Sequence, residues 1–322
     1  MAEISVIVIA YNGLHENTVH CLESVFRHSG KEDYELIVVD NNSTDGTGDY
    51  LGVLAGREPL LKPVLNQSNR GFAGGNNDGM RVASGNIIVL LNNDTLVTEG
   101  WLTKLKETLL SDQSIGLAGP VSNAVGNEQK IFTCGNTPAD IIKEGEAWTR
   151  NSIGDTFKTE RLGFFCVAFR REIMETVGLL DEAYDLGFFE DDDYCLRVQK
   201  AGYMLICRED IFVYHQGSAS FGRNSKKIRE LLRKNRSLLE RKFDIKYSPR
   251  HPRDRQLDLV ESYIEKHLFS ENKVSLGYKI ENRFKLINEL IPHGFLKRRI
   301  FKQRLNTVMQ SWIKSSHQPP AA

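Results

Sequence analysis

The acid run Glu190–Asp193 is the part of this sequence best suited to proton chemistry. Four consecutive carboxyl groups repel one another unless something uses or neutralises them, and two aromatic residues, Phe188 and Phe189, precede them. Aromatic neighbours predict a partly desolvated cleft, where a carboxyl group with a raised pKa makes a usable general base. Part of the run also has a structural explanation: acids favour the first turn of a helix, and Asp193 stands four residues before Arg197.

A second group of polar residues stands at the end of an apolar run. The run Ile87–Leu91 stops abruptly in Asn92-Asn93-Asp94. It predicts a strand buried on both faces, and ligands of open α/β sheets bind at the carboxyl ends of such strands. A carboxylate there is suited to hold a hard cation and the phosphate that the cation carries. His215 ends a later apolar run; a lone histidine is more often structural, but a neutral imidazole is also a sound ligand for Mn²⁺.

Two further segments are suited to binding a nucleotide. Asp40 follows a predicted strand and can accept a hydrogen bond from a base or ribose, or from the amides of its own turn. The loop Asn69–Asn77 is rich in Gly and Asn, so its backbone can approach a ligand closely, with Arg70 available for charge. A standard dinucleotide-binding domain is not expected, because the first strand runs into Tyr11-Asn12-Gly13 instead of G-x-G-x-x-G.

Alternating strands and helices must position these groups. Strands are predicted at Ile4–Ala10, Tyr34–Val39, Val64–Asn66, Ile87–Leu91, Ile115–Pro120, Phe164–Phe169, Tyr203–Cys207 and Ile211–Tyr214, and helices at Asn17–His28, Thr47–Leu54, Trp101–Leu110, Glu172–Val177 and Asp191–Lys200, with another running from the Gly/Asn loop to Ala83. This alternation predicts a parallel α/β sheet with right-handed crossovers. Residues 121–160 are polar and give no assignable pattern.

The charge distribution divides the chain in two. Residues 1–222 carry 18 Lys and Arg against 32 Asp and Glu, whereas residues 223–322 carry 24 against 10. We therefore predict an α/β domain over 1–222 and a basic, mainly helical region over 223–322, which either faces an anionic partner or packs against the acidic body. The five cysteines are scattered and form no CxxC pair, so neither a zinc site nor a disulfide framework is indicated. The start of the chain is interpreted as a strand, not a signal peptide.

The last predicted helix is both amphipathic and basic. Its apolar residues are Phe301, Leu305, Val308, Met309 and Trp312, and Lys297, Arg298, Arg299, Lys302 and Arg304 lie in the same segment. Such a helix can lie in a membrane interface. Alternatively, its apolar face docks on the catalytic domain or on a second subunit, which would allow oligomerisation through the C-terminal region.

Taken together, the motifs resemble those of the family 2 glycosyltransferases of the GT-A fold, and most closely the bacterial rhamnosyltransferase-like group. The motifs that carry the resemblance are Ser5–Asn12, Val38–Thr47, Asn69–Asn76, Leu91–Asp94 and Phe189–Asp193, in the family's order and spacing. They lie within residues 4–220. The resemblance implies a GT-A α/β fold, a mostly parallel central sheet flanked by helices, to which this chain adds a basic helical C-terminal extension.

The resemblance also implies roles for single residues in the inverting transfer of a sugar from a nucleoside diphosphate. Asp94 would hold Mg²⁺ or Mn²⁺ on the diphosphate, and Asn92 replaces the first acid of the family's Asp-x-Asp motif, which makes His215 more important as a second ligand. Asp191 is the predicted base, with Glu190 as the alternative. The predicted donor-binding residues are Ala10, Tyr11, Asn12, Asp40, Asn69, Arg70, Gly71, Gly74, Asn76 and Asn93.

The expected partners are a nucleoside-diphosphate sugar, of the dTDP-rhamnose or UDP-hexose type, and a glycan or lipid-linked saccharide acceptor in cell-surface polysaccharide synthesis. No nucleic-acid partner is expected, and the predicted location is cytoplasmic, with peripheral contact at the inner face of the cell membrane. Two other functions remain open: a sugar-nucleotide-binding protein without catalysis, and a sugar-phosphate nucleotidyltransferase. The second is disfavoured, because residues 10–15 lack a glycine-rich, basic loop for a triphosphate.

Overall fold

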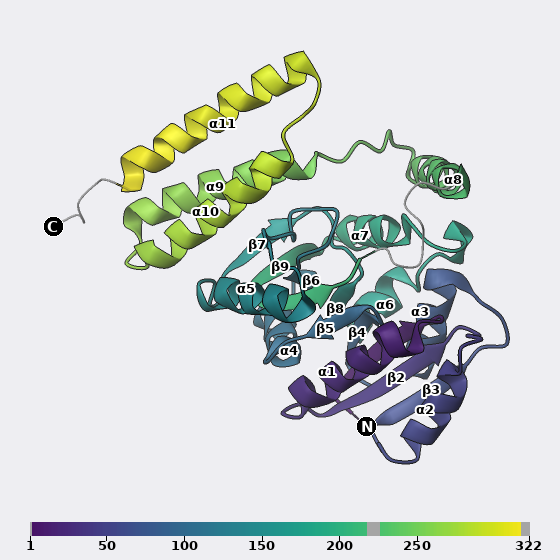
Figure 1. Ribbon diagram of the computed structural model, residues 1–322. Coiled ribbons are helices and arrows are strands. Elements are labelled where there is room, and N and C mark those ends of the chain that lie inside the picture. Colours follow the sequence, from purple (N-terminus) through teal and green to yellow (C-terminus); the bar gives the residue numbers. More distant parts are fainter. Residues whose placement is uncertain (1, 218–225, 317–322) are drawn as a thin grey trace.

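The computed structural model, which describes residues 2–217 and 226–316, is built around one sheet (Figure 1). Its strands are β1 (Ile4–Ala10), β2 (Tyr34–Asp40), β3 (Leu61–Leu65), β4 (Ile87–Asn92), β5 (Thr95–Val97), β6 (Ile115–Val121), β7 (Thr156–Thr159), β8 (Cys166–Arg170) and β9 (Met204–His215). The order is β3-β2-β1-β4-β8-β6-β9-β5, and β7 pairs with β9 beside this path.

The half of the sheet formed by β1 to β4 is parallel. Strands β1, β2, β3 and β4 all run the same way, so their carboxyl ends meet at one edge. Beyond β4 the sheet becomes mixed: β8 is antiparallel to both β4 and β6, while β6 and β9 are parallel. The predicted α/β sheet is confirmed, and its parallel part is the part that holds the predicted donor-binding segments.

Helices cover both faces of the sheet, because successive strand residues point to opposite sides. One apolar core lies under α1 (Val19–Ser29), α2 (Thr47–Ala55) and α4 (Trp101–Ser111). The other lies under α3 (Gly71–Val82), α5 (Pro138–Arg150), α6 (Arg171–Val177) and α7 (Glu190–Lys200). In β1, for example, Val6 and Val8 face the first core and Ile7 faces the second.

The structure corrects four details of the sequence prediction. The Gly/Asn segment is not a loop, since α3 already begins at Gly71, and the two strands predicted within 203–214 are the single strand β9. The short strand β5 follows Asp94 directly. The unassigned residues 121–160 contain α5 and β7; Thr137 caps the start of α5, where its hydroxyl accepts a hydrogen bond from the Asp140 amide.

The C-terminal region is helical, as predicted. It consists of α8 (Lys226–Phe243), α9 (Pro252–Phe269), α10 (Lys273–Glu289) and α11 (Phe295–Ser316), and the predicted boundary at 222 lies outside the described residues. Helices α9, α10 and α11 run side by side around a third apolar core (Figure 1). Phe301, Leu305 and Val308 of α11 are buried there, and Trp312 meets His267 edge-on at 4.9 Å between ring centres. Most of the apolar face considered for a membrane is therefore covered by the chain itself.

A buried ionic cluster attaches these helices to the sheet. Glu209 of β9 accepts hydrogen bonds from Lys279 at 2.7 Å and Arg283 at 2.8 Å, both on α10, and from the Tyr263 hydroxyl of α9. All four side chains are almost completely buried. The alternative in which the basic region packs against the acidic body thus holds for this part of the chain. Among the described residues, no helix is both long and apolar enough to cross a bilayer.

Candidate active site

The loops that follow β1 and β2 are tied together at the carboxyl edge of the sheet. The buried Asp40 carboxylate accepts a hydrogen bond from the Ser43 amide at 3.0 Å. Asn12, held at φ 55°, accepts one from the Thr44 amide at 2.9 Å, and its own amide donates to Ser43 Oγ at 2.9 Å. The side chain of Tyr11 is 48% exposed above these loops. The residues predicted to bind the nucleoside are therefore held in place by hydrogen bonds at one edge of the sheet, where the Tyr11 ring is exposed.

Asn41 joins this edge to the start of α3. Its backbone amide donates to the Ala10 carbonyl at 2.8 Å. Its side-chain amide donates to Asn69 Oδ1 at 3.1 Å and to the Gly71 carbonyl at 3.0 Å, while its Oδ1 accepts from the Arg70 amide at 3.2 Å. Asn41 was not among the predicted site residues, although it stands in one of the motifs, because its partners lie about 30 positions away.

The remaining predicted residues of this segment differ in accessibility. The guanidinium of Arg70 is 40% exposed and pairs with Asp78 at 3.0 Å and with Glu182 at 2.8 Å, so its charge is already partly balanced. Gly74 packs against the Arg70 side chain, where a Cβ would have no room. Asn76 is buried within α3, and its side-chain amide donates to the Phe72 carbonyl at 2.9 Å. Arg70 is thus the member of this group that can reach a ligand directly.

The two predicted metal ligands meet. His215 Nε2 lies 3.3 Å from Asp94 Oδ1, and both side chains are about 15% exposed. His215 Nδ1 lies 2.6 Å from the Ala124 carbonyl, which fixes the ring orientation. Although burial opposes the charged ring, the hydrogen bond and charge of Asp94 raise the pKa of His215. Asn93, in contrast, donates its side-chain amide to Thr18 Oγ1 at 2.9 Å.

This pair is small for a complete metal site. Among residues 2–217 and 226–316 there is no group of three or more His, Cys, Asp or Glu side chains placed to hold an ion. A cation bound by Asp94 and His215 would therefore need further oxygen ligands from its phosphate partner or from water, which is common for Mg²⁺.

The loop before α7 has an unusual backbone conformation. Phe188 and Phe189 have φ values of 71° and 77°, which costs of order 1–3 kcal/mol for each bulky residue. The buried side chain of Asn235, on α8, donates to the carbonyls of Tyr184 at 2.8 Å, Gly187 at 2.9 Å and Phe188 at 3.0 Å. Strain of this kind persists only where surrounding contacts enforce it, so a residue of the C-terminal region stabilises the loop that presents the acid run.

The acids at the start of α7 are in different environments. Burial and then the charge of Asp192 raise the pKa of Asp191 to about 7, while its side chain keeps some exposed surface. Burial and then the charge of Asp191 raise the pKa of Glu190 well above its ordinary value; this side chain is only 6% exposed, and its Oε2 finds no hydrogen-bond partner among the described residues. Asp192 also has a raised pKa and some exposed surface, but its Oδ1 lies 3.9 Å from Arg161 Nη1. Asp191 is therefore the accessible acid with a raised pKa that has no ion pair among the described residues.

Asp193 has the structural role that its position suggested. It is completely buried and pairs with Arg197 at 2.7 Å, four residues later in α7. It also accepts a hydrogen bond from the Tyr184 hydroxyl at 3.0 Å and pairs with Lys242 of α8 at 2.6 Å. These contacts anchor α7 and leave Asp193 no free oxygen for chemistry.

The start of α3 and the loop before α7 are in contact. Gly71 has φ 69°, and a Cβ at this position would collide with the carbonyl of Asp185. The Phe72 amide donates to the Leu186 carbonyl at 3.4 Å. The residues predicted to lie near the donor thus border the loop that leads into α7, whose first turn holds the predicted base.

The segment 161–165 connects the acid run to the Asp94–His215 pair. Arg161 Nη1 lies 3.9 Å from Asp192 Oδ1, and the Leu162 amide donates to Cys195 Sγ on α7 at 3.4 Å. At its other end, the Phe165 ring stacks on His215 with 5.3 Å between ring centres. Four residue steps span at most about 14 Å. The predicted base and the predicted metal ligands therefore border the same part of the molecule.

Comparison with known proteins identifies the family of this arrangement. Residues 5–178, more than half of the chain, match the family described as Glycosyl transferase family 2. The chain belongs to this family. The matched residues include the sheet edge with Asp40, Asn41 and Asp94, and they end before α7. The acid run therefore lies outside the matched residues, and the tertiary fold brings it close to this edge.

Curated relatives of this family 2 chain include glycosyltransferases from archaea and bacteria. Glycosyltransferase AglE of Haloferax volcanii is 26% identical, with 66% of each chain covered, and the GalNAc(5)-diNAcBac-PP-undecaprenol beta-1,3-glucosyltransferase of Campylobacter jejuni is 28% identical, with 57% of each covered. The alignments span 23%, 66% and 64% of the lengths of the first three relatives.

Solved structures share the fold. The mannosyltransferase PcManGT of Pyrobaculum calidifontis, in complex with GDP-Man and Mn²⁺, superposes with a TM-score of 0.51 at 18% identity, covering 98% of this chain and 86% of that one. GalNAc-T7 with UDP, GalNAc and Mn²⁺ gives 0.56 at 16% identity, covering 72% and 48%. These matches confirm the predicted GT-A fold with its C-terminal helical extension.

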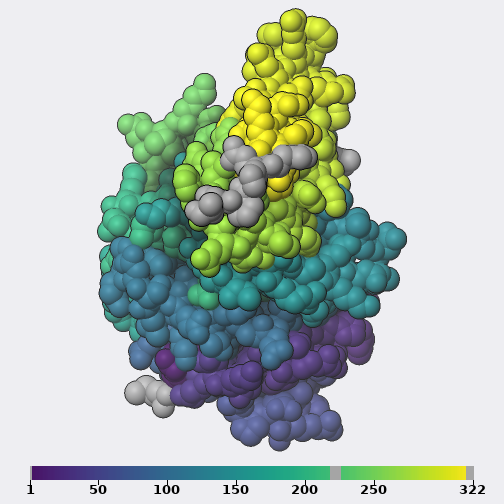
Figure 2. Space-filling view, turned by 90° about the vertical axis from the view of Figure 1, so that its left-hand side faces the viewer, coloured from purple at the N-terminus to yellow at the C-terminus, as the bar shows by residue number. Residues whose placement is uncertain are grey.

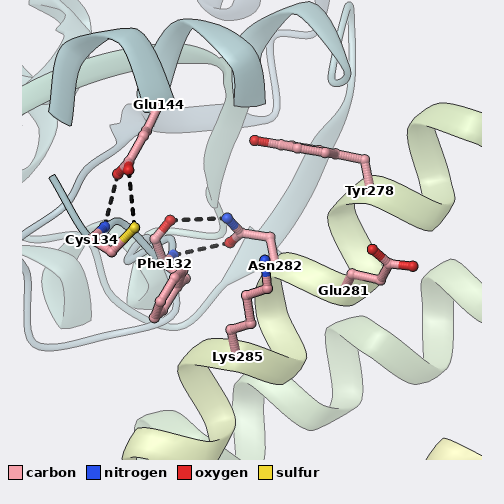
Figure 3. Close-up of a pocket in the computed structure, with 7 residues that line it drawn as sticks. All are labelled: Phe132, Cys134, Glu144, Tyr278, Glu281, Asn282 and Lys285. Atoms are coloured by element: carbon pink, nitrogen blue, oxygen red, sulfur yellow. Dashed lines mark hydrogen bonds between the residues drawn. The ribbon is translucent and has the colours of Figure 1, made fainter. Parts of the chain in front are cut away.

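One pocket of this family 2 chain lies apart from the predicted site. Figure 3 shows it between α5 and α10. The Asn282 side chain there exchanges two hydrogen bonds of 2.9 Å with the Phe132 backbone, and Glu144 accepts from the Cys134 amide at 2.8 Å and from its thiol at 3.2 Å. None of the predicted site residues lines this pocket.

Proposed function

We propose that this chain is an inverting glycosyltransferase that moves a sugar from a nucleoside diphosphate to an acceptor hydroxyl. The observation that carries the proposal is Asp191: a carboxyl group with a pKa raised to about 7 and some exposed surface, in the first turn of α7, directly after a strained loop that borders the start of α3. A group with that pKa can take a proton from an acceptor hydroxyl near neutral pH. The donor would be of the dTDP-rhamnose or UDP-hexose type.

The chemistry requires one displacement. Asp191 removes the proton of the acceptor hydroxyl as its oxygen attacks the anomeric carbon from the face opposite the diphosphate, which leaves with both electrons of the broken bond. A single displacement inverts the configuration, by the same logic as in glycosidases that use no covalent intermediate. Glu190 is the alternative base, but its burial and lack of partners favour a neutral side chain.

The donor set fits a divalent cation at Asp94 and His215. The Ala124 carbonyl accepts the Nδ1 proton of His215, so Nε2 is the ring atom directed to Asp94 and to an ion. Mg²⁺ or Mn²⁺, when bound, supplies positive charge that stabilises the leaving diphosphate. Two protein ligands leave room for phosphate oxygens. Asp40, Asn12 and Tyr11 would then hold the nucleoside at the neighbouring strand ends.

We further propose that the acceptor is a glycan or a lipid-linked saccharide at an anionic membrane surface. Residues 295–300, the first turns of α11, are all exposed and project at the top of Figure 2. Phe295, Leu296 and Ile300 are 82%, 66% and 61% exposed there. The neighbouring exposed cations are Lys297, Arg298, Arg299 and Lys302. An exposed apolar cluster among cations matches an anionic bilayer in both polarity and charge.

The membrane contact is tested by surface substitutions. A variant with Phe295→Ser, Leu296→Ser and Ile300→Ser should bind less to vesicles of phosphatidylcholine and phosphatidylglycerol in sedimentation, while its donor binding stays unchanged. Ile153→Ser, at an equally exposed apolar residue of the α/β part, is the control. Equal binding by both variants would refute the contact. Truncation before α8 is a poor test, because it also removes Asn235 from the loop before α7.

The catalytic proposal is tested with Asp191→Asn. A thermal-shift screen of nucleotide sugars with Mn²⁺ first identifies the donor. The variant should then bind that donor as the wild type does and show no transfer. Asp33→Asn, at an exposed residue near the opposite edge of the sheet, is the control and should retain activity. Donor binding without transfer by the wild type, over a range of acceptors, would favour a sugar-nucleotide-binding protein. Consumption of nucleoside triphosphate with sugar phosphate would favour a nucleotidyltransferase.

A further inference from the structure

Asp192, the neighbour of the predicted base, is contacted by residues from two distant parts of the chain. Arg161, which follows β7, places Nη1 at 3.9 Å from Asp192 Oδ1. Tyr247, which follows α8, donates a hydrogen bond from its hydroxyl to the Asp192 carboxylate, and the Arg161 guanidinium donates to the same hydroxyl. Asp192, Arg161 and Tyr247 therefore form a small network beside Asp191.

Each partner is held in place by contacts of its own. Arg161 donates from Nη2 to the Gly126 carbonyl at 3.1 Å. The Tyr247 amide donates to Glu240 Oε1 at 3.0 Å, and its ring meets Phe189 edge-on at 5.8 Å between centres. A network whose members are fixed from outside can set the charge near a reacting group without rearrangement during the reaction.

We propose that Arg161 and Tyr247 are positioning residues for the transfer reaction: they hold the Asp192 carboxylate beside the base Asp191, and the opposite charges of Arg161 and Asp192 together set the proton affinity of Asp191. This inference rests on the proposed function, because it assigns Asp191 as the base. It also gives the segment between α8 and α9, in the C-terminal region, a direct part in the active site.

The charges around Asp191 make opposite contributions. The positive charge of Arg161 lowers the pKa of Asp191, and the negative charge of Asp192 raises it. Burial raises the pKa of Asp192 above its ordinary value, and the Tyr247 hydrogen bond and the charge of Arg161 limit this rise. Among the residues that the structure describes, Glu190 and the thiol of Cys195, both on α7, also interact with the charge of Asp191, and Asp193 interacts with Glu190. Of these, Asp193 is balanced by Arg197 and Lys242.

Substitutions in the network should therefore move the acid limb of the pH–rate profile in opposite directions. Arg161→Gln removes a positive charge that stabilises the ionised form of Asp191. It should therefore shift the acid limb of kcat/KM to higher pH by roughly one unit, which is a tenfold loss of kcat/KM below the limb. Asp192→Asn and Tyr247→Phe should shift it to lower pH, the second by less, because Tyr247 acts through Asp192. Arg161→Lys keeps the charge and should restore most of the wild-type profile.

Two controls separate this network from a general structural role. Arg150→Gln, at an exposed arginine of α5, should leave the profile unchanged. Thermal unfolding of each variant shows whether it is folded. Shifts in the same direction for Arg161→Gln and Asp192→Asn, or no shift in either folded variant, would overturn the inference.

A second measurement is independent of catalysis. Carbon-13 NMR titration of the side-chain carboxyl groups, with Asp191→Asn used for assignment, reports the pKa of Asp191 directly. The same opposite shifts are expected without any substrate. If the wild type transfers no sugar, the proposed function fails, while this titration still decides whether the network controls Asp191.

Discussion

A substitution at Arg283 tests how strongly the buried ionic cluster attaches the C-terminal helices to the sheet. Its guanidinium donates to Glu209 at 2.8 Å, to the Glu128 carbonyl at 3.2 Å and to Gln256 Oε1, and its Nε donates to the Tyr263 hydroxyl at 3.2 Å. The side chain has no exposed surface. Replacing it by methionine keeps most of the length and removes all four hydrogen bonds, so Arg283→Met tests the buried cluster with little change of shape.

The expected cost follows from what remains after the substitution. Glu209 keeps its hydrogen bonds from Lys279 at 2.7 Å and from the Tyr263 hydroxyl. In the wild type, the positive charges of Lys279 and Arg283 balance the negative charges of Glu209 and Asp155. Without Arg283, one of these negative charges is unbalanced. The Gln256 and Glu128 oxygens lose a donor inside the protein. Removing one partner of a buried ion pair costs about 3–5 kcal/mol, more than an ordinary surface substitution at roughly 0.5 kcal/mol or less.

Urea denaturation followed by circular dichroism measures this free energy. Lys285→Met, on the exposed side of the same helix, removes a charge of the same sign and should cost little. In a double-mutant cycle, Glu209→Gln with Arg283→Met should cost less than the sum of the single changes, because the double variant leaves fewer unbalanced charges. An Arg283→Met cost within about 1 kcal/mol of that for Lys285→Met would refute the reasoning, since the cluster would then contribute little to attachment.

Three further outcomes are expected at the active site. Transfer, measured as kcat/KM against pH, should fall as the pH is lowered through about 7, because burial raises the pKa of Asp191 and the protonated acid is no base. Asp94→Asn should weaken donor binding in Mn²⁺ but not in EDTA, which titration calorimetry with the donor can resolve. Asn235→Ala should cost roughly 1–3 kcal/mol in thermal unfolding and lower kcat, since three carbonyls of the strained loop lose their donor; an unchanged kcat would mean that the loop keeps its shape without α8.

Local patterns were enough to predict the edge of the sheet that holds the donor-binding segments. Asp40 and Asp94 each follow an apolar run, and parallel strands bring their carboxyl ends to one edge. The same patterns failed for residues 121–160, where α5 is polar on its outer side and only a short Thr137-Pro138 start marks it. They also failed at Gly71, where glycines and asparagines of α3 are buried by packing against β1 and β2 instead of forming a loop.

The four acids of the run show the limit of sequence information within one motif. Their order in the chain predicts a helix start and a possible base, and it does not distinguish one carboxyl group from the next. Tertiary contacts make the distinction, because Arg197 and Lys242 neutralise Asp193 while Asp191 stays without a direct ion pair among the described residues.

The sequence by itself determined most of the strands, the family motifs and the types of side chain at the strand ends, because each depends on residues that are neighbours in the chain. The tertiary structure alone decided that Asn41 joins two loops, that Asn235 supports the strained loop and that Arg161 and Tyr247 meet at Asp192. Each of these is a single polar residue whose partner is far away in sequence, so its local surroundings carry no periodic signal. Its role arises only when folding buries the partner and leaves a hydrogen bond or charge to be satisfied.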